Sequence, residues 1–294
     1  MEIRVLKYFL AVTQEKNMNK AAQLLHISQP TISRQLKALE DELGTQLFIR
    51  GNREITLTED GKYLVDKAKQ IITLSDQAEL NIGNEPSSIS GRVIIGCNET
   101  PSVKYLAEAT KKINNDYPNI LIDVVSTNAD TIKKSLDNGI FDFGIILSPT
   151  DNKNYSFLNL PGNQEWGLFI PKNDDLAKKE SINKNDLLAS DLIISRQPEF
   201  TNTLNKWIGS NQEKLKVTAL YDLLYNALLF VESGVGYALG VGRTINTIGT
   251  DLVFRPLYPH LRSSSSLIWL KNVNMSSAAK IVLKQMYDEV EMNK

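Results

Sequence analysis

Residues 17–43, NMNKAAQLLHISQPTISRQLKALEDEL, predict two short helices joined by a tight turn. Asn17 is placed to cap the first helix. Ser28 is placed to cap the second helix, with Pro30 in its first turn, where a missing N–H costs nothing. The inward face of the second helix is predicted from an apolar repeat at helical spacing, made of Ile32, Leu36, Leu39 and Leu43. The pattern indicates a helix-turn-helix.

The opposite face of the second helix carries short or bidentate hydrogen-bonding side chains near its N-terminus and cations further along. Such side chains suit base edges and phosphates respectively. The predicted DNA-binding residues on this helix are Ser28, Gln29, Pro30, Thr31, Ser33, Arg34 and Lys37. The alternative is a solvated face of an ordinary helical hairpin, so the neighbouring segments must decide.

The segments on either side favour DNA binding. Residues 3–15 predict a third helix that covers the apolar side of the hairpin. LFIRGNREITLT at 47–58 predicts a two-stranded wing, in which Leu47, Ile49, Ile55 and Leu57 alternate around a turn at Gly51-Asn52. Arg50 and Arg53 near its tip are expected in or near a minor groove. From Lys16 to Arg53 six cations face three acids, a local charge of +3 that suits phosphate contacts.

Composition excludes several other classes of site. The 294 residues are 42% hydrophobic and 23% charged with a net charge of −1, which is ordinary for a globular protein of two or three domains. Cys97 is the only cysteine, and the two histidines, His26 and His260, are far apart, so we expect no intrachain disulfide, no Cys/His metal cluster and no cofactor. No export signal or long apolar run is visible, and a cytoplasmic protein is expected.

A long helix follows the wing. Thr58 is a plausible cap, and the helix is expected to run to about Ile82. An apolar stripe along it is typical of a coiled-coil seam and predicts dimerisation through Leu64, Ala68, Ile71, Ser75, Ala78 and Ile82. The competing interpretation is that this stripe packs on its own domain. GNEPSSISG at 83–91 predicts a hinge and a domain boundary.

Beyond the hinge, strands alternate with helices, which predicts a parallel α/β sheet. Strands are expected at 92–97, 120–126 and 141–147, then near 166–170, 191–195, 216–220, 236–241 and 265–270. Helices are expected near 101–116, 130–138, 201–213, 222–232 and 275–291. The two sets of elements indicate two lobes of similar size with a cleft between them.

The chain resembles the LysR-type transcriptional regulators over essentially its whole length. In the first part the resemblance rests on Phe9, Ala21-Ala22, Leu25, Ser28-Gln29-Pro30, Ser33, Leu36, Leu39-Glu40, Leu43-Gly44, Leu47-Phe48, Arg50, Leu57-Thr58 and Gly61. More diffuse matches follow at Gly91-Arg92, Tyr117-Pro118, Gly139, Phe141-Asp142 and Gly234-Val235-Gly236. Two patterns depart from that family. Leu239-Gly240-Val241 lacks its usual proline, and Asp174-Asp175-Leu176-Ala177 stands where His-Pro-Leu-Ala is typical.

The resemblance implies an α/β multidomain protein. Its parts would be a winged helix-turn-helix at 1–58, a long linker helix for dimerisation at 59–82, a hinge at 83–91 and a two-lobed domain similar to periplasmic binding proteins at 92–294. Lobe I would take about 92–161 and 266–294, and lobe II about 162–265. The expected function is sequence-specific transcription regulation controlled by a small-molecule effector bound between the lobes. Expected partners are double-stranded promoter DNA, a second copy or a tetramer, and RNA polymerase, with no membrane.

Two other classes of protein fit less well. An enzyme is not expected, because the chain has no dinucleotide fingerprint, no phosphate loop and no Gly-x-Ser-x-Gly elbow, and no catalytic residue is predicted. A solute-binding protein is the alternative that the two-lobed half alone would allow. It would carry an export signal and lack the basic winged domain, and the sequence has the reverse.

The effector site is predicted from the residues that come directly after each cleft-facing strand. Thr100 would cap a helix with Pro101 at its first position. The expected effector residues are Thr100, Pro101, Ser126, Asn128, Ser148, Ser195 and Arg196. Hydroxyls and amides at helix N-termini with one arginine favour an anionic effector. Glu99 and Asp222 would instead repel an anion or contact an amine, and each polar residue could also be a simple helix cap.

Overall fold

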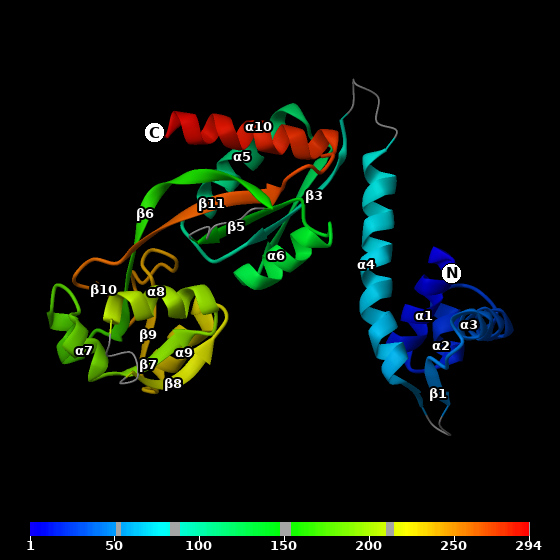
Figure 1. Ribbon diagram of the computed structural model, residues 1–294, viewed down its shortest axis with the longest axis horizontal. Helices are drawn as coiled ribbons and strands as arrows, with labels where there is room; N and C mark the ends of the chain where they lie inside the picture. The colour runs from blue at the N-terminus through cyan, green and yellow to red at the C-terminus, as the bar shows by residue number, and fades with distance from the viewer. Residues whose placement is uncertain (51–53, 83–88, 148–153, 210–214, 294) are drawn as a thin grey trace. The chain divides into compact units, whose positions relative to one another are not determined.

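The computed structural model describes residues 1–50, 54–82, 89–147, 154–209 and 215–293 (Figure 1). The chain divides into two compact units, Met1–Ile82 and Gly83–Lys294. Unit 1 is helical with a small two-stranded sheet, and unit 2 is a mixed α/β structure. No helix in the described ranges is both long enough and apolar enough to cross a membrane.

Unit 1 begins with three short helices. They are α1 (Ile3–Glu15), α2 (Met18–Leu24) and α3 (Gln29–Leu43). Both predicted caps are confirmed, since the Asn17 side chain accepts from the main-chain N–H groups of Asn19 and Lys20, and Ser28 Oγ accepts from that of Thr31. Gly44, at φ +70°, ends α3 in the left-handed conformation that glycine adopts without strain.

The inward face of α3 differs from the prediction at its last turn. Ile32, Leu36 and Leu39 are buried, but Leu43 is 43% exposed. Glu40 is the buried residue at this end of the helix. Its Oε1 accepts from the main-chain N–H of Leu47 at 2.8 Å and of Phe48 at 3.3 Å. The carboxylate therefore ties the end of α3 to the first strand, and this contact leaves Leu43 outside the core.

The wing is formed by β1 (Phe48–Arg50) and β2 (Ile55–Leu57), which pair antiparallel with Phe48 opposite Leu57. Phe48 is buried with its ring 5.2 Å from that of Phe9, whereas Ile49 is 56% exposed. The predicted alternation at 47–49 was therefore wrong, because Phe48 fills the core position. The predicted turn at Gly51-Asn52 lies outside the described residues.

Helix α4 (Glu59–Asn81) starts at the predicted cap, where Thr58 Oγ1 accepts from the Gly61 N–H at 3.0 Å. A Cβ at Gly61 would lie only 2.2 Å from the Leu47 carbonyl oxygen, so this position requires glycine. Leu64 and Ala68 are buried in the core that α1 and α3 also form. Their assignment to a dimer seam was therefore wrong, and the competing interpretation holds for this half of the stripe.

The second half of α4 is less covered. Ile71 packs partly against the same core, and Lys7 of α1 pairs with Asp76 at 3.2 Å. Ser75 is half-buried, whereas Ala78 and Ile82 are exposed. Leu74, which the predicted stripe did not include, is 40% exposed. Leu74, Ala78 and Ile82 therefore leave apolar surface open toward the C-terminal end of α4.

Lobe I of unit 2 has a parallel core of β4 (Ile120–Ser126), β3 (Gly91–Cys97) and β5 (Phe143–Leu147). Helices α5 (Val103–Asp116) and α10 (Ser277–Met292) cover one face, and α6 (Ala129–Asp137) covers the other (Figure 1). Alternate residues of β3 serve the two faces, with Val93 and Ile95 packing on α5 and α10, and Ile94 on α6.

Lobe II has parallel strands β8 (Lys216–Tyr221), β7 (Asp191–Ser195) and β9 (Tyr237–Val241). Its helices are α7 (Lys184–Leu188), α8 (Pro198–Ile208) and α9 (Leu224–Glu232), with a short 3₁₀ turn at Asp175–Lys178. Strand β10 (Leu252–Pro256), which was not predicted, lies off the main path.

Two antiparallel strands pass through both lobes, so the predicted parallel sheet was incomplete. They are β6 (Tyr155–Pro171) and β11 (Arg262–Leu270). The first part of β6 pairs with β11, and its last part pairs with β9 and β10. Figure 1 shows β6 running from one lobe into the other. The eight-strand path is β4-β3-β5-β11-β6-β9-β7-β8.

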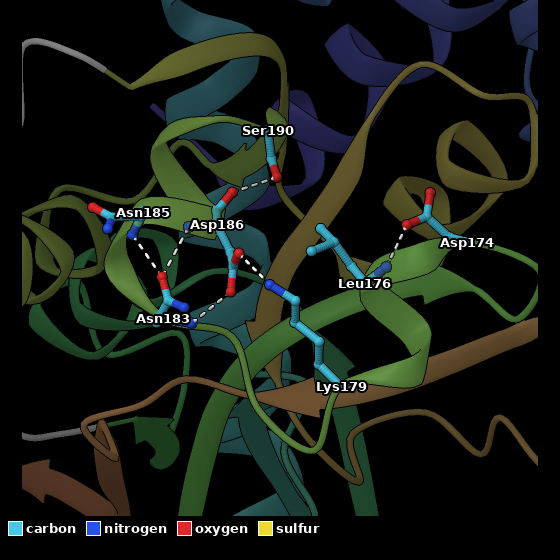
Figure 2. A network of polar contacts seen from close by, with 7 residues as sticks. All are labelled: Asp174, Leu176, Lys179, Asn183, Asn185, Asp186 and Ser190. Atoms are coloured by element: carbon cyan, nitrogen blue, oxygen red, sulfur yellow. Dashed lines mark hydrogen bonds and ion pairs between the residues drawn. The ribbon is translucent and has the colours of Figure 1, made fainter.

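The segment where the sequence departs from the His-Pro-Leu-Ala pattern is held by side-chain caps (Figure 2). Asp174 accepts from the Leu176 N–H at 2.8 Å. Asn183 and Asp186 form a capping box at the start of α7, and Lys179 pairs with Asp186. Asp174 also accepts from the Tyr237 hydroxyl at 2.6 Å, and burial raises the pKa of Tyr237 to about 12. The departure is therefore accommodated by local hydrogen bonds.

Candidate functional site: a DNA-facing helix and an interlobe cavity

The first turns of α3 present the predicted DNA-binding residues on one surface. Ser28, Pro30, Arg34 and Lys37 are exposed, and Gln29, Thr31 and Ser33 are half-buried. The Ser28 and Thr31 hydroxyls lie 2.8 Å apart, so the cap and its neighbour are held by each other. We call these seven residues the α3 surface. Their side chains stand near a helix N-terminus, where main-chain N–H groups also favour phosphate.

The cations near this surface differ in their surroundings. Lys37 Nζ lies 2.9 Å from Asp41 Oδ1, one helical turn along, so its charge is partly balanced within the helix. Arg34 is exposed. Lys16 and Lys20, which the sequence counts among the local cations, are also exposed. The Lys16 carbonyl accepts from the Ile55 N–H at 3.1 Å, which joins the end of α1 to the wing.

The two predicted minor-groove arginines are only partly covered by the structure. The main chain of Arg50 ends strand β1, paired with Ile55, but its side chain is not among the described groups. Arg53 lies outside the described residues. Their contact with a minor groove stays a prediction.

Unit 2 contains a cavity of about 70 Å³ between its lobes, which we call the interlobe cavity. Lobe I and lobe II both line it, and Ser263 of β11 contributes from between them. The lining residues are Asn98, Glu99, Thr127, Ala129, Lys133, Ile146, Leu147, Trp166, Ser195, Gln197, Phe200, Thr203, Tyr221, Asp222, Leu223, Leu224, Val241, Thr244 and Ser263. Its position at the carboxyl ends of β3, β7 and β8 follows the rule for parallel sheets.

Of the seven predicted effector residues, Ser195 lines this cavity. Thr100, Pro101, Ser126, Asn128 and Arg196 are not among its lining residues, and Ser148 lies outside the described residues. Thr127 lines the cavity in place of its neighbour Ser126, which is exposed. Pro101 lines a separate depression. The rule found the right end of the sheet, but it did not fix which side chain of each loop faces inward.

Thr100 does not cap α5 as predicted. The helix starts at Val103, two residues after Pro101, and its N-cap position is Ser102. The Thr100 hydroxyl lies 3.0 Å from the Ser265 hydroxyl and accepts from the Ser102 N–H at 3.3 Å. Gln164 Nε2 donates to both Ser102 Oγ and Ser265 Oγ. Thr100 is therefore buried in a polar cluster with β6 and β11, which takes the hydroxyl away from the helix end.

Arg196, the arginine expected to bind an anion, is paired within unit 2. Its Nε lies 3.3 Å from Asp222 Oδ2, and Asn128 Nδ2 donates to the same carboxylate at 3.5 Å. Asn128 is also the side-chain cap of α6. Gln197 Oε1 accepts from the Ala129 N–H at 3.4 Å. These contacts join the lobes at the cavity's edge and engage the groups on which the anion hypothesis depended.

The N-terminus of α9 is occupied by a carboxylate of the chain itself. Glu99, from the loop after β3, accepts from the Leu224 N–H across the cavity. The helix dipole favours negative charge at this point, and Glu99 supplies it. The charged residues among the described lining groups are Glu99, Asp222 and Lys133. The anionic effector suggested by the sequence therefore meets two carboxylates on the cavity wall.

An aromatic wall closes the lobe II side of the cavity, and sequence reasoning missed it. The Trp166 and Phe200 rings meet edge to face at 4.4 Å, and Tyr221 stands beyond Phe200. Trp166 Nε1 donates to Ser263 Oγ at 2.6 Å, and the Tyr221 hydroxyl donates to the Leu239 carbonyl at 2.8 Å. Burial, and secondarily the charge of Glu99, raise the pKa of Tyr221. The sequence signal available was Tyr221, which comes directly after the strand predicted near 216–220.

Two family models match the chain. Residues 3–62 match the model described as a bacterial regulatory helix-turn-helix protein of the lysR family. Residues 86–290 match the LysR substrate binding domain. The α3 surface lies within the first match and the interlobe cavity within the second.

Individual relatives agree with both matches. The uncharacterized HTH-type transcriptional regulator YbhD of Escherichia coli K12 is 28% identical over 286 residues, which cover 95% of this chain and 89% of that protein. The HTH-type transcriptional regulator CysL of Bacillus subtilis 168 is 32% identical over 251 residues, which cover 85% and 80%. The crystal structure of full-length CbnR with its target DNA matches the whole of both chains with a TM-score of 0.78 at 21% identity, which supports the fold.

Proposed function

Since the chain belongs to the LysR family of transcriptional regulators, we propose that the α3 surface reads promoter DNA in the major groove. The proposal rests on the position of these residues, which are exposed or half-buried on one helix with a capped N-terminus. Gln29, Ser33 and Arg34 would contact base edges, and Lys37 would contact phosphate. Arg50 and Arg53 would lie in or near the minor groove.

For the domains, we propose a winged helix-turn-helix at 1–58, a linker helix at 59–82, a hinge at 83–91 and an effector domain at 92–294. The division of the structure at Ile82 supports the boundary before the hinge. The lobe boundaries proposed from the sequence need one refinement, because β6 and β11 belong to both lobes. Because residues 3–62 match a helix-turn-helix model, we do not retain the alternative of a solute-binding protein.

The test of DNA reading is selection of bound duplexes from a random pool, followed by gel-shift titration on the selected and a scrambled sequence. We expect an inverted repeat, because a two-fold symmetric dimer presents two recognition helices to two half-sites. Recovery of no preferred sequence, with equal affinity for both duplexes, would refute the proposal.

We propose that the C-terminal half of α4 pairs with α4 of a second copy. Leu74 and Ala78 are exposed one turn apart, and Tyr63 and Lys67 lie on the same side with the ammonium 5.8 Å from the ring centre. This surface lies beside the stripe predicted from the sequence, because Leu64 and Ala68 are already covered within unit 1. A tetramer and a contact with RNA polymerase are the further assemblies we propose from the family.

Leu74→Lys tests this pairing by sedimentation velocity. A lysine there would bury a charge against its symmetry mate, and we expect the dimer to dissociate. Thr73→Lys, one residue earlier on another side of the helix, adds the same charge and should sediment as the parent. Identical profiles for Leu74→Lys and the parent would contradict the pairing.

For the effector domain, we propose that a small molecule binds in the interlobe cavity and changes how the protein acts at its promoter. Both lobes line the cavity. A ligand that binds one arrangement of the lobes more tightly than another would therefore shift the equilibrium between the two arrangements. Because proteins of this family act on promoters, we propose that this protein is cytoplasmic.

A further inference from the structure

Hydrogen-bond acceptors on the wall of the interlobe cavity have unused capacity. Asn98 is only 6% exposed, and its Oδ1 is buried without a donor among the described residues. The main-chain N–H of the same residue donates to the Ile145 carbonyl at 2.9 Å, which holds the main chain of the loop at this residue. A buried acceptor that lacks a donor costs free energy until a ligand supplies one.

Glu99 adds a charged acceptor beside Asn98. One of its carboxylate oxygens accepts from the Leu224 N–H, and a carboxylate has lone pairs for further donors. Asp222 lines the cavity from the other lobe. Several donors on the wall are engaged, since Trp166 Nε1 donates to Ser263, the Tyr221 hydroxyl donates to the Leu239 carbonyl, and Lys133 has an interaction of its own. The Thr244 hydroxyl, which is neutral, is buried without a partner among the described residues.

The wall also carries apolar side chains, and the space is small. Ile146, Leu147, Phe200 and Val241 contribute hydrocarbon surface. The cavity's volume of about 70 Å³ is well below the roughly 300–1,000 Å³ of pockets for drug-sized ligands. A short chain with one polar head suits this space better than a large ligand.

We propose that the effector of this protein carries a protonated amine on a short apolar body. Its nitrogen would donate to Asn98 Oδ1 and to the Glu99 carboxylate, and its body would lie against Trp166 and Phe200. The inference rests on the proposed function of the interlobe cavity as the effector site, and it replaces the anion suggested by the sequence. An anion would face Glu99 and leave the Asn98 oxygen without a donor.

The test uses the full chain and three matched series of probes, from ethyl to pentyl: the alkylammonium ions, the corresponding carboxylates and the corresponding alcohols. Binding is measured by calorimetry and by thermal shift at constant ionic strength. We expect the alkylammonium ions to bind and to raise the melting temperature, and the carboxylates and alcohols to have little effect. Stronger binding of the carboxylates or alcohols, or binding by none of the three series, would overturn the proposal.

Three variants locate the amine. Glu99→Gln should lower alkylammonium affinity about tenfold or more, because it removes a charge-assisted hydrogen bond. Asn98→Leu removes the buried oxygen at similar volume, so it should weaken binding while the melting temperature of the free protein stays the same or rises. Glu108→Gln, an exposed position on α5, is the matched control and should bind as the parent. Unchanged affinity in both Glu99→Gln and Asn98→Leu would refute the site.

Failure of this inference is separable from failure of the proposed function. If a carboxylate binds the cavity and changes the gel-shift affinity for selected DNA, the amine is wrong and regulation by an interlobe ligand stands. If the protein shows no preferred DNA sequence, the proposed function fails, whichever probe binds unit 2.

Discussion

The α3 surface and the interlobe cavity are built in opposite ways. The α3 surface takes its seven residues from ten consecutive positions, 28–37, of one capped helix. The interlobe cavity collects residues from β5, β6, β7, β8, β9, β11, α6, α8 and α9, and from the loops after β3, β4, β7, β8 and β9. A site of the first kind is set by local chemistry, whereas a site of the second kind depends on the pairing of distant strands.

This difference predicts where each site is fragile. When unit 1 loses the packing that holds its short helices and strands, the α3 surface should lose DNA binding. The stability of unit 2 should not change. When a substitution removes a contact between distant strands, unit 2 and its interlobe cavity should lose stability. DNA binding by unit 1 should persist. Four substitutions test this separation.

Gly61→Ala should have the largest effect. Its Cβ would lie 2.2 Å from the Leu47 carbonyl oxygen, a main-chain atom that cannot move without disturbing β1. We expect unit 1 to lose ~3 kcal/mol of unfolding free energy. Urea unfolding followed by hydrogen exchange, resolved by unit, measures it. Lys62→Ala at the next, exposed position should be close to neutral, and an equal loss in unit 2 would break the comparison.

Arg34→Ala should weaken binding to the selected DNA by ~1–3 kcal/mol and relax specificity at one base pair, if the guanidinium contacts a base edge. Because Arg34 is exposed, the stability of unit 1 should not change. Gel-shift titration against single-base variants of the selected site measures both quantities. Equal affinity of parent and variant on every duplex would show that Arg34 makes no contact with DNA that contributes to binding.

Ser263→Ala should destabilise unit 2 by ~1–2 kcal/mol, because it leaves the buried Trp166 indole N–H without its acceptor at 2.6 Å. In a Trp166→Phe background, which has no indole N–H, the same change should cost much less. The double-mutant cycle isolates this hydrogen bond. Altered DNA affinity of unit 1 without effector would contradict the independence of the two sites.

Lys37→Ala should have the smallest effect. Lys37 already pairs with Asp41 at 2.9 Å, so a phosphate contact must compete with that carboxylate. We expect a loss below ~1 kcal/mol, similar on selected and scrambled DNA, and a salt slope lower by about one. Titrations at several salt concentrations measure the slope. A loss confined to the selected sequence would assign Lys37 to base reading instead.

The sequence predicted unit 1 nearly residue by residue because its signals are local. Asn17, Ser28 and Thr58 each cap a helix within three residues of themselves, and all three caps are observed. The errors arose where tertiary contacts decide. Leu43 lost its core position to Glu40, whose carboxylate binds the start of β1, and Leu64 proved to pack on its own unit.

In unit 2 the elements were predictable but the site was not. Thr100 and Pro101 look like the start of a helix, yet a hydrogen bond between the Thr100 hydroxyl and that of the distant Ser265 holds Thr100 elsewhere. Strand β6 was predicted only from Trp166 onward. PGNQE at 161–165 has the composition of a loop, yet Gln164 and Glu165 pair with β11 within the strand. Trp166 and Phe200 meet only after β6 and α8 pack together.

Strands β6 and β11 also limit how this protein can be recombined. The chain passes once from unit 1 to unit 2, between Ile82 and Gly83, so a gene fusion at that point could give unit 1 a different sensor. The lobes allow no such exchange, because β6 serves both of them without a break. Insertion of one residue into β6 would reverse which side chains of one lobe face inward relative to the other. The two lobes must therefore be inherited, engineered and transplanted as one piece.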